Sequence, residues 1–104
     1  MTREFDCVLT LAIPDSLEEE ILDLLVAHTD IVSGFSVHAA EGLGSGAPLR
    51  TSLERVRGRS RRKMITLLLQ QEQAGVLIER LRVQIPSADV AWWSTPLTGF
   101  GRLA

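Results

Sequence analysis

Basic side chains gather in one short part of this chain. Seven of the eleven Lys and Arg residues fall between Arg50 and Lys63. Guanidinium groups bind phosphates and carboxylates through paired N–H donors, and a lysine ammonium adds a compact positive charge. A glycine within a strand indicates a bulge or a close approach to the backbone. We therefore predict that the cluster binds a small anion or a nucleotide. The predicted site comprises Arg57, Gly58, Arg59, Arg61, Arg62 and Lys63.

The same charges have other interpretations. They could form the solvated end of a strand, or pair with the acidic residues Glu18, Glu19 and Glu20. They could also face an acidic protein partner or nucleic acid. The formal net charge of −2 gives the whole protein no attraction for nucleic acid, so we expect none among its partners.

Three side chains have the chemistry of transition-metal ligands, but none is spaced as in a CxxC or HxxxH motif. Cys7 and His28 fall on apolar faces of predicted elements, so we expect both to pack in the core. His38 lies just before a Gly-rich segment. Three copies of His38 around a threefold axis, or His38 together with Glu41, could hold a divalent ion. This is our second, separate site prediction.

No arrangement of nucleophile, base and acid can be identified in the sequence, so we expect that the protein is not an enzyme, and the sequence names no cofactor. A single cysteine excludes an intrachain disulfide and is typical of a reducing compartment. No apolar stretch approaches the ~20 residues that span a bilayer. We expect a cytoplasmic protein that is not itself embedded in a membrane.

The elements that must position these residues follow from hydrophobic spacing. Alternating residues predict strands, and apolar residues three and four apart predict helices. The predicted strands cover 5–13, 31–40, 55–70 and 88–95, and the helices run from about 16 to 28 and from 71 to 84. The second strand should direct Phe35 and Val37 toward the core. Ser16 and Glu19 have capping-box spacing. A Gly-rich segment of about 41–54 predicts a mobile loop. The order βαββαβ in a single domain of residues 1–104 predicts an α+β ferredoxin-like sandwich, with two helices on one face of a four-stranded antiparallel sheet.

The second face of that sheet is also apolar. Met64 and Leu68 lie on the face opposite to Ile65, and Trp92 and Trp93 must point to opposite faces. Two helices can cover only one face, and monomers rarely expose large contiguous apolar patches. We therefore predict that the protein assembles with copies of itself through the sheet.

Several segments resemble the PII-like superfamily, and in particular a family of small bacterial PII-like domains of uncharacterised function. They are DCVLTLAIP at 6–14, VRGRSRRK at 56–63, LIERLR at 77–82 and ADVAWWSTPL at 88–97. The resemblance covers about residues 4–97. It implies a homotrimer packed sheet to sheet. It also implies a sensor that binds its ligand near the loop between strands two and three and modulates a membrane transporter or other partner. Family members often lie beside heavy-metal efflux genes, which implies a metal-binding accessory protein as an alternative. A structural trimer without a ligand is a further alternative.

Overall fold

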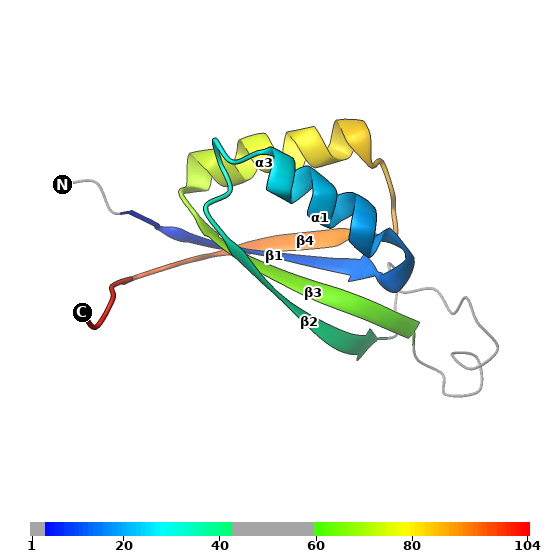
Figure 1. Cartoon of the computed structure of the whole chain (residues 1–104), viewed down its shortest axis with the longest axis horizontal. Coiled ribbons are helices and arrows are strands. Elements are labelled where there is room, and N and C mark those ends of the chain that lie inside the picture. Colours follow the sequence, from blue (N-terminus) through cyan, green and yellow to red (C-terminus); the bar gives the residue numbers. More distant parts are fainter. Residues whose placement is uncertain (1–3, 43–59) are drawn as a thin grey trace.

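The fold has two layers, a four-stranded antiparallel sheet and two helices that cover one of its faces (Figure 1). The computed structural model describes residues 4–42 and 60–104. The elements are β1 (Cys7–Pro14), a 3-10 turn η1 (Asp15–Leu17), α1 (Glu18–Ala27), β2 (Phe35–Gly42), β3 (Ser60–Leu69), α3 (Gln71–Gln84) and β4 (Ala91–Pro96). The strand order is β2-β3-β1-β4, so the predicted ferredoxin-like topology is confirmed.

The core lies between the sheet and the helices. Alternate residues of the two central strands are buried on this face, as the period of two requires. Leu9 and Leu11 of β1 and Leu67 of β3 are fully buried there, and Ile21 of α1 and Leu77 of α3 pack against them from above. Cys7 belongs to the same cluster, as predicted.

The start of the first helix differs from the prediction. The proposed capping box of Ser16 and Glu19 is wrong, since α1 begins at Glu18 and no side chain caps η1 or α1. Pro14 directs the chain into the 3-10 turn, and the Glu18 N–H is satisfied by the backbone carbonyl of Asp15. A capping box does occur at the other helix, where the Gln70 N–H donates to Oε1 of Gln73 at 3.1 Å. Neither helix among the described residues has the length and hydropathy of a membrane span.

The second strand begins later than predicted. Ile31 and Val32 belong to the turn after α1, because their N–H groups donate to the carbonyl of His28 at 3.1 and 2.9 Å. Phe35 contacts the core, but Val37, which was expected there, is 36% exposed because β2 is an outer strand. The predicted loop of 41–54 lies outside the described residues except for Glu41 and Gly42, which end β2.

The face of the sheet opposite to the helices is apolar along its middle. Across this face Val8 is opposite Leu68, and Thr10 is opposite Trp93. No described helix covers these side chains (Figure 1). The open apolar face is therefore confirmed for the described residues, whereas assembly through it stays a prediction.

Candidate functional site

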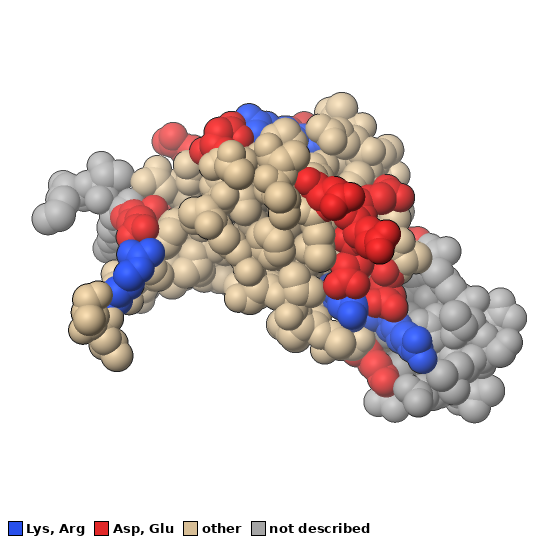
Figure 2. Space-filling view, viewed as in Figure 1, with Lys and Arg blue, Asp and Glu red and all other residues tan. Residues whose placement is uncertain are grey.

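Four elements meet at the end of the sheet where β3 begins. In register, Arg61 lies opposite Glu41 of β2, and Arg62 lies opposite Pro14 of β1. Blue and red side chains adjoin one another at this end of the molecule (Figure 2). Together they line an open hollow of about 720 Å³. Its lining residues are Asp15, Ala39, Ala40, Glu41, Arg61, Arg62 and Lys63.

Alternation along β3 divides the basic residues between the two faces of the sheet. Lys63 lies opposite the buried Ile13 and so points to the helix side. Its Nζ is 3.5 Å from Oδ1 of Asp15 and 3.7 Å from Oε1 of Glu18. The ammonium therefore joins the beginning of β3 to η1 and α1. Pairing with the acidic first helix, which was an alternative to anion binding, thus holds for Lys63.

Arg62 lies on the open face of the sheet. Its side chain crosses Gly42, where an added Cβ would come within 2.9 Å of both Cζ and Nε. Because glycine has no Cβ, the Arg62 guanidinium can lie directly against the backbone at the end of β2. Arg62 is partly exposed, so a ligand can reach it from solvent.

Carboxylates already offset much of the positive charge in the hollow. Asp15 and Glu41 line it with the three basic residues, and Glu18 contacts Lys63 from outside. An anion that enters must compete with these groups for N–H donors. A ligand with several acceptor oxygens can do so better than a monovalent ion, because it makes several charge-assisted hydrogen bonds at once.

The remaining predicted anion ligands, Arg57, Gly58 and Arg59, lie outside the described residues, so their positions relative to the hollow stay untested.

The predicted metal pair does not form within one chain. His38 is exposed and faces the open side of the sheet, opposite Met64 in register, whereas Glu41 is three residues further and points to the other side. Within 4–42 and 60–104, no three His, Cys, Asp or Glu side chains gather as a metal site would require. Three copies of His38 around an axis stay a prediction.

A charged cluster that the sequence did not reveal joins the two helices. The Arg80 guanidinium donates to both carboxylate oxygens of Asp30 at 3.1 and 3.2 Å and to Nδ1 of His28 at 3.0 Å. Because guanidinium is only a donor, Nδ1 must accept, so the imidazole proton lies on Nε2. Hydrogen bonding from Arg80 lowers the pKa of Asp30. His28 is therefore a partly exposed polar contact and not the core residue that was expected.

Burial raises the pKa of the Cys7 thiol, and the nearby negative charge of Asp6 raises it further. Cys7 as a residue is only 3% exposed. Reactive cysteines have lowered pKa values and are accessible, so Cys7 lacks both properties of a nucleophile.

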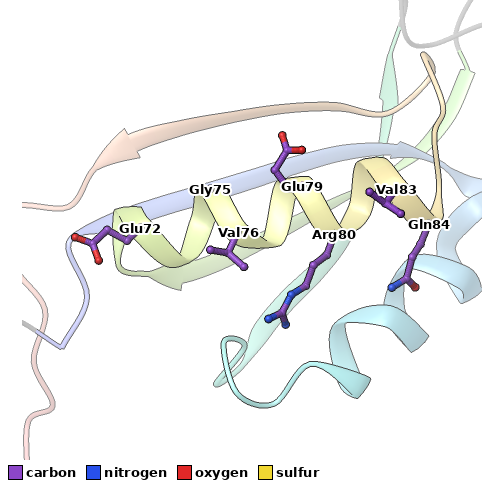
Figure 3. Close-up of a pocket in the computed structure, with 7 residues that line it drawn as sticks. All are labelled: Glu72, Gly75, Val76, Glu79, Arg80, Val83 and Gln84. Atoms are coloured by element: carbon purple, nitrogen blue, oxygen red, sulfur yellow. The ribbon is translucent and has the colours of Figure 1, made fainter.

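A second hollow, also of about 720 Å³, runs along the outer side of α3 (Figure 3). All its lining side chains come from that helix, and Val76 and Val83 provide its apolar part. Glu72 and Gln84 lie at its two ends (Figure 3). Charged groups do not converge here as they do at the beginning of β3, so the basic hollow is the better candidate for a ligand.

A family model described as "Protein of unknown function (DUF3240)" matches residues 4–104. The crystal structure of a DUF3240 family protein from Shewanella baltica OS155 has a TM-score of 0.76 and 19% identity, and the match covers 98% of this chain and 100% of that chain. CPII from Thiomonas intermedia K12, a nitrogen regulatory PII-like protein bound to ADP, AMP and bicarbonate, has a TM-score of 0.68 and 18% identity, over 93% of this chain and 96% of that chain. None of the curated proteins matches the chain. At these identities the solved structures establish the fold alone.

Proposed function

The chain belongs to the DUF3240 family and has a PII-like fold, and from this premise we propose that it is a regulatory protein that binds a small anion or a nucleotide where β3 begins. The observation that carries the proposal is the hollow lined by Arg61, Arg62 and Lys63. Its volume of about 720 Å³ falls within the range of small-molecule sites. The likeness to CPII, which is bound to ADP, AMP and bicarbonate, supports this class of ligand.

Ligand binding would exchange one set of charged partners for another. Lys63 holds Asp15 and Glu18, and an incoming anion competes with those carboxylates for the ammonium. Arg62 is the more available group, because its guanidinium lies across Gly42 on the open face. A ligand that contacts Arg62 therefore lies beside Gly42, the last residue of β2. We propose that this exchange alters the grip of the protein on a partner, and a membrane transporter is the partner class that the PII-like resemblance suggests.

The wider proposal is a cytoplasmic homotrimer, assembled through the open face of the sheet, that acts by binding and not by catalysis. The apolar row that includes Val8, Leu68 and Trp93 supports assembly, because water-exposed patches of this kind usually meet a partner. Among the described residues, the metal-binding alternative is supported by His38 alone.

Calorimetric titration tests the ligand proposal. ADP, AMP and bicarbonate would be titrated at low and at physiological salt into the wild-type chain, Arg62→Ala and a matched control, Arg102→Ala. Arg102 pairs with Glu4 at 3.3 Å in the terminal segments and does not line the hollow. Loss of a charge-assisted hydrogen bond costs about 1.5–3 kcal/mol, so Arg62→Ala should weaken binding roughly 10-fold to 150-fold while the control binds normally.

Equal affinities in the two variants would refute the assignment of the site. No heat with any of these ligands, in a protein that still assembles, would favour the purely structural trimer. A zinc titration of wild type and His38→Ala decides the metal alternative, since identical heats would exclude His38 as a ligand.

A further inference from the structure

The outer side of α3 carries apolar residues where a helix that faces water is normally polar. Val76 and Val83 are 46% and 77% exposed, and no described element lies over them (Figure 1). Together with Glu72 and Glu79 they are spaced by four, three and four positions, so the four residues form one stripe, here called the outer row of α3. At about 100° per residue the outer row lies directly opposite the buried stripe of the helix, which is Ala74, Leu77, Ile78 and Leu81.

The residues of this side do not favour the helix that carries them. Valine loses side-chain freedom in a helix, and Gly75, which adjoins the outer row, is the poorest helix former after proline. In the described part of the chain an added Cβ at Gly75 would meet no atom within 4 Å, so packing within the chain does not require glycine there. Neither Val76 nor Val83 belongs to the core cluster. A contact made by the outer side of α3 accounts better for these residues than the fold does.

The charges of the outer row are negative. Glu72 and Glu79 stand on either side of Val76, and Glu72 lies at one end of the second hollow (Figure 3). Glu79 shares an ion pair with Arg82, but both side chains are mostly exposed, so solvent screens the pair. Arg80 also lines the hollow, and its charge is matched by Asp30. The surface therefore presents valines and carboxylates in alternation.

We propose that the outer row of α3 binds an amphipathic helix of a partner protein, in which aliphatic residues alternate with lysine or arginine along the contact. The aliphatic side chains would pack on Val76 and Val83, and the cations would reach Glu72 and Glu79, as in other helix-in-groove complexes. Long basic side chains suit this surface because their methylene stems can cover valine while the charge reaches a carboxylate. The surface is separate from the basic hollow at the beginning of β3 and does not depend on it.

Two other occupants fit this surface less well. In an antiparallel pair of α3 helices from two copies of the chain, Glu72 would lie against Val83 and Val76 against Glu79. A parallel pair would place each glutamate against its own copy. Both arrangements remove carboxylates from water without a cation, which is costly. A small molecule is also disfavoured, because one helix lines the whole hollow and small-molecule sites normally enclose most of their ligand.

The size of the surface indicates a transient complex. Fourteen residues make α3 about 21 Å long, and with side chains it is about 10 Å wide, so the outer side covers roughly 200 Å². Even twice this area is below the 800 Å² or so that a standard stable interface buries on each partner. We therefore expect a dissociation constant of roughly 10–100 μM for a single helix.

Titration of the isotopically labelled full chain with a synthetic peptide, followed by NMR, tests the proposal. The probe is a helical peptide of about 20 residues, long enough to fold in water, in which leucine and lysine alternate along one face with the spacing of the outer row. A second peptide has glutamate at every lysine position. With the lysine peptide we expect shift changes centred on Val76 and Val83, and weaker binding at high salt. The glutamate peptide should bind at least ten-fold more weakly.

Three variants sharpen the test. Val83→Lys places a cation on the outer row and should weaken binding of the lysine peptide at least ten-fold. Val26→Lys is the matched control, since Val26 is 63% exposed on α1 and does not line the hollow. This control should bind as wild type does and should melt at about the same temperature as Val83→Lys. Glu72→Gln should weaken binding roughly two-fold to five-fold, as expected for one exposed ion pair.

Each contrary outcome overturns a stated part of the proposal. Equal binding of the two peptides would refute the basic character of the partner. Shift changes centred elsewhere, or equal binding by Val83→Lys and Val26→Lys, would refute the assignment of the surface. No shift changes at millimolar peptide would overturn the whole proposal, and shift changes in the outer row when the chain alone is concentrated would replace the partner by a second copy. Arg62→Ala should bind the lysine peptide as wild type does, so failure of the ligand proposal can be distinguished from failure of this one.

Discussion

Replacing Lys63 by methionine should reveal whether this residue stabilises the fold or binds the ligand. Methionine keeps much of the apolar stem and removes the ammonium that contacts Asp15 at 3.5 Å and Glu18 at 3.7 Å. The Lys63 side chain is 25% exposed, so solvent screens the two pairs, and each should contribute about 0.2–1 kcal/mol. The variant also leaves two carboxylates close together without the cation between them. We expect a loss of about 1 kcal/mol in the free energy of unfolding.

Urea unfolding followed by circular dichroism measures this loss at a fixed protein concentration, because assembly also affects stability. About 1 kcal/mol corresponds to roughly 4–8 °C in the melting temperature of a domain of this size. High salt should reduce the difference between wild type and Lys63→Met. Together with Glu18→Gln and the double variant, Lys63→Met forms a double-mutant cycle. The coupling energy between Lys63 and Glu18 should be about 0.5 kcal/mol.

Arg62→Met is the matched control, since Arg62 is the next residue but lies on the other face of β3. We expect Arg62→Met to weaken anion binding with little effect on unfolding, whereas Lys63→Met should lower the free energy of unfolding. Equal stability of Lys63→Met and wild type at low salt, with no coupling to Glu18, would refute the structural role of Lys63.

Three further predictions concern other parts of the chain. Burial raises the pKa of the Cys7 thiol, so iodoacetamide should modify it slowly at pH 8 and much faster once urea unfolds the protein; fast labelling of the folded protein would contradict this. Arg80 lowers the pKa of Asp30, so this carboxylate should stabilise the fold at pH values above its usual pKa, and the stabilisation should be lost as the pH falls through the lowered value. The free energies of unfolding of wild type and Asp30→Asn, measured as a function of pH, should therefore converge in acid. A difference between the two proteins that does not change with pH would exclude the effect. Gly75 lies inside α3 with no atom within 4 Å of an added Cβ, so Gly75→Ala should raise the free energy of unfolding by about 0.5–1 kcal/mol; a decrease would mean that a partner packs there.

Much of the fold could be predicted because it depends on local periodicity. The alternation of two in the strands and the apolar stripes of the helices specify which faces are buried, and the order of elements then leaves the ferredoxin-like topology as the simplest arrangement. The same parity separated Arg62 from Lys63 and turned the two tryptophans apart. His38 and Glu41 are three residues apart, so the same alternation places their side chains on opposite faces of β2. The prediction that these two residues bind a metal together did not take this into account.

Other errors came from features that local spacing does not determine. The first helix begins after a 3-10 turn because Pro14 sets the backbone there, so Ser16 never becomes a cap. Val37 alternates correctly, but its exposure depends on the position of β2 at the edge of the sheet.

By itself, then, the sequence determined that basic side chains cluster at the start of a strand, and that the sheet has a second apolar face. Only the tertiary structure decided what those groups meet. Lys63 contacts the carboxylates of η1 and α1, Arg80 joins α3 to Asp30, and β4 becomes an outer strand of the sheet. These relations join residues far apart in the chain, so they depend on how the elements pack and not on the local spacing from which each element can be recognised.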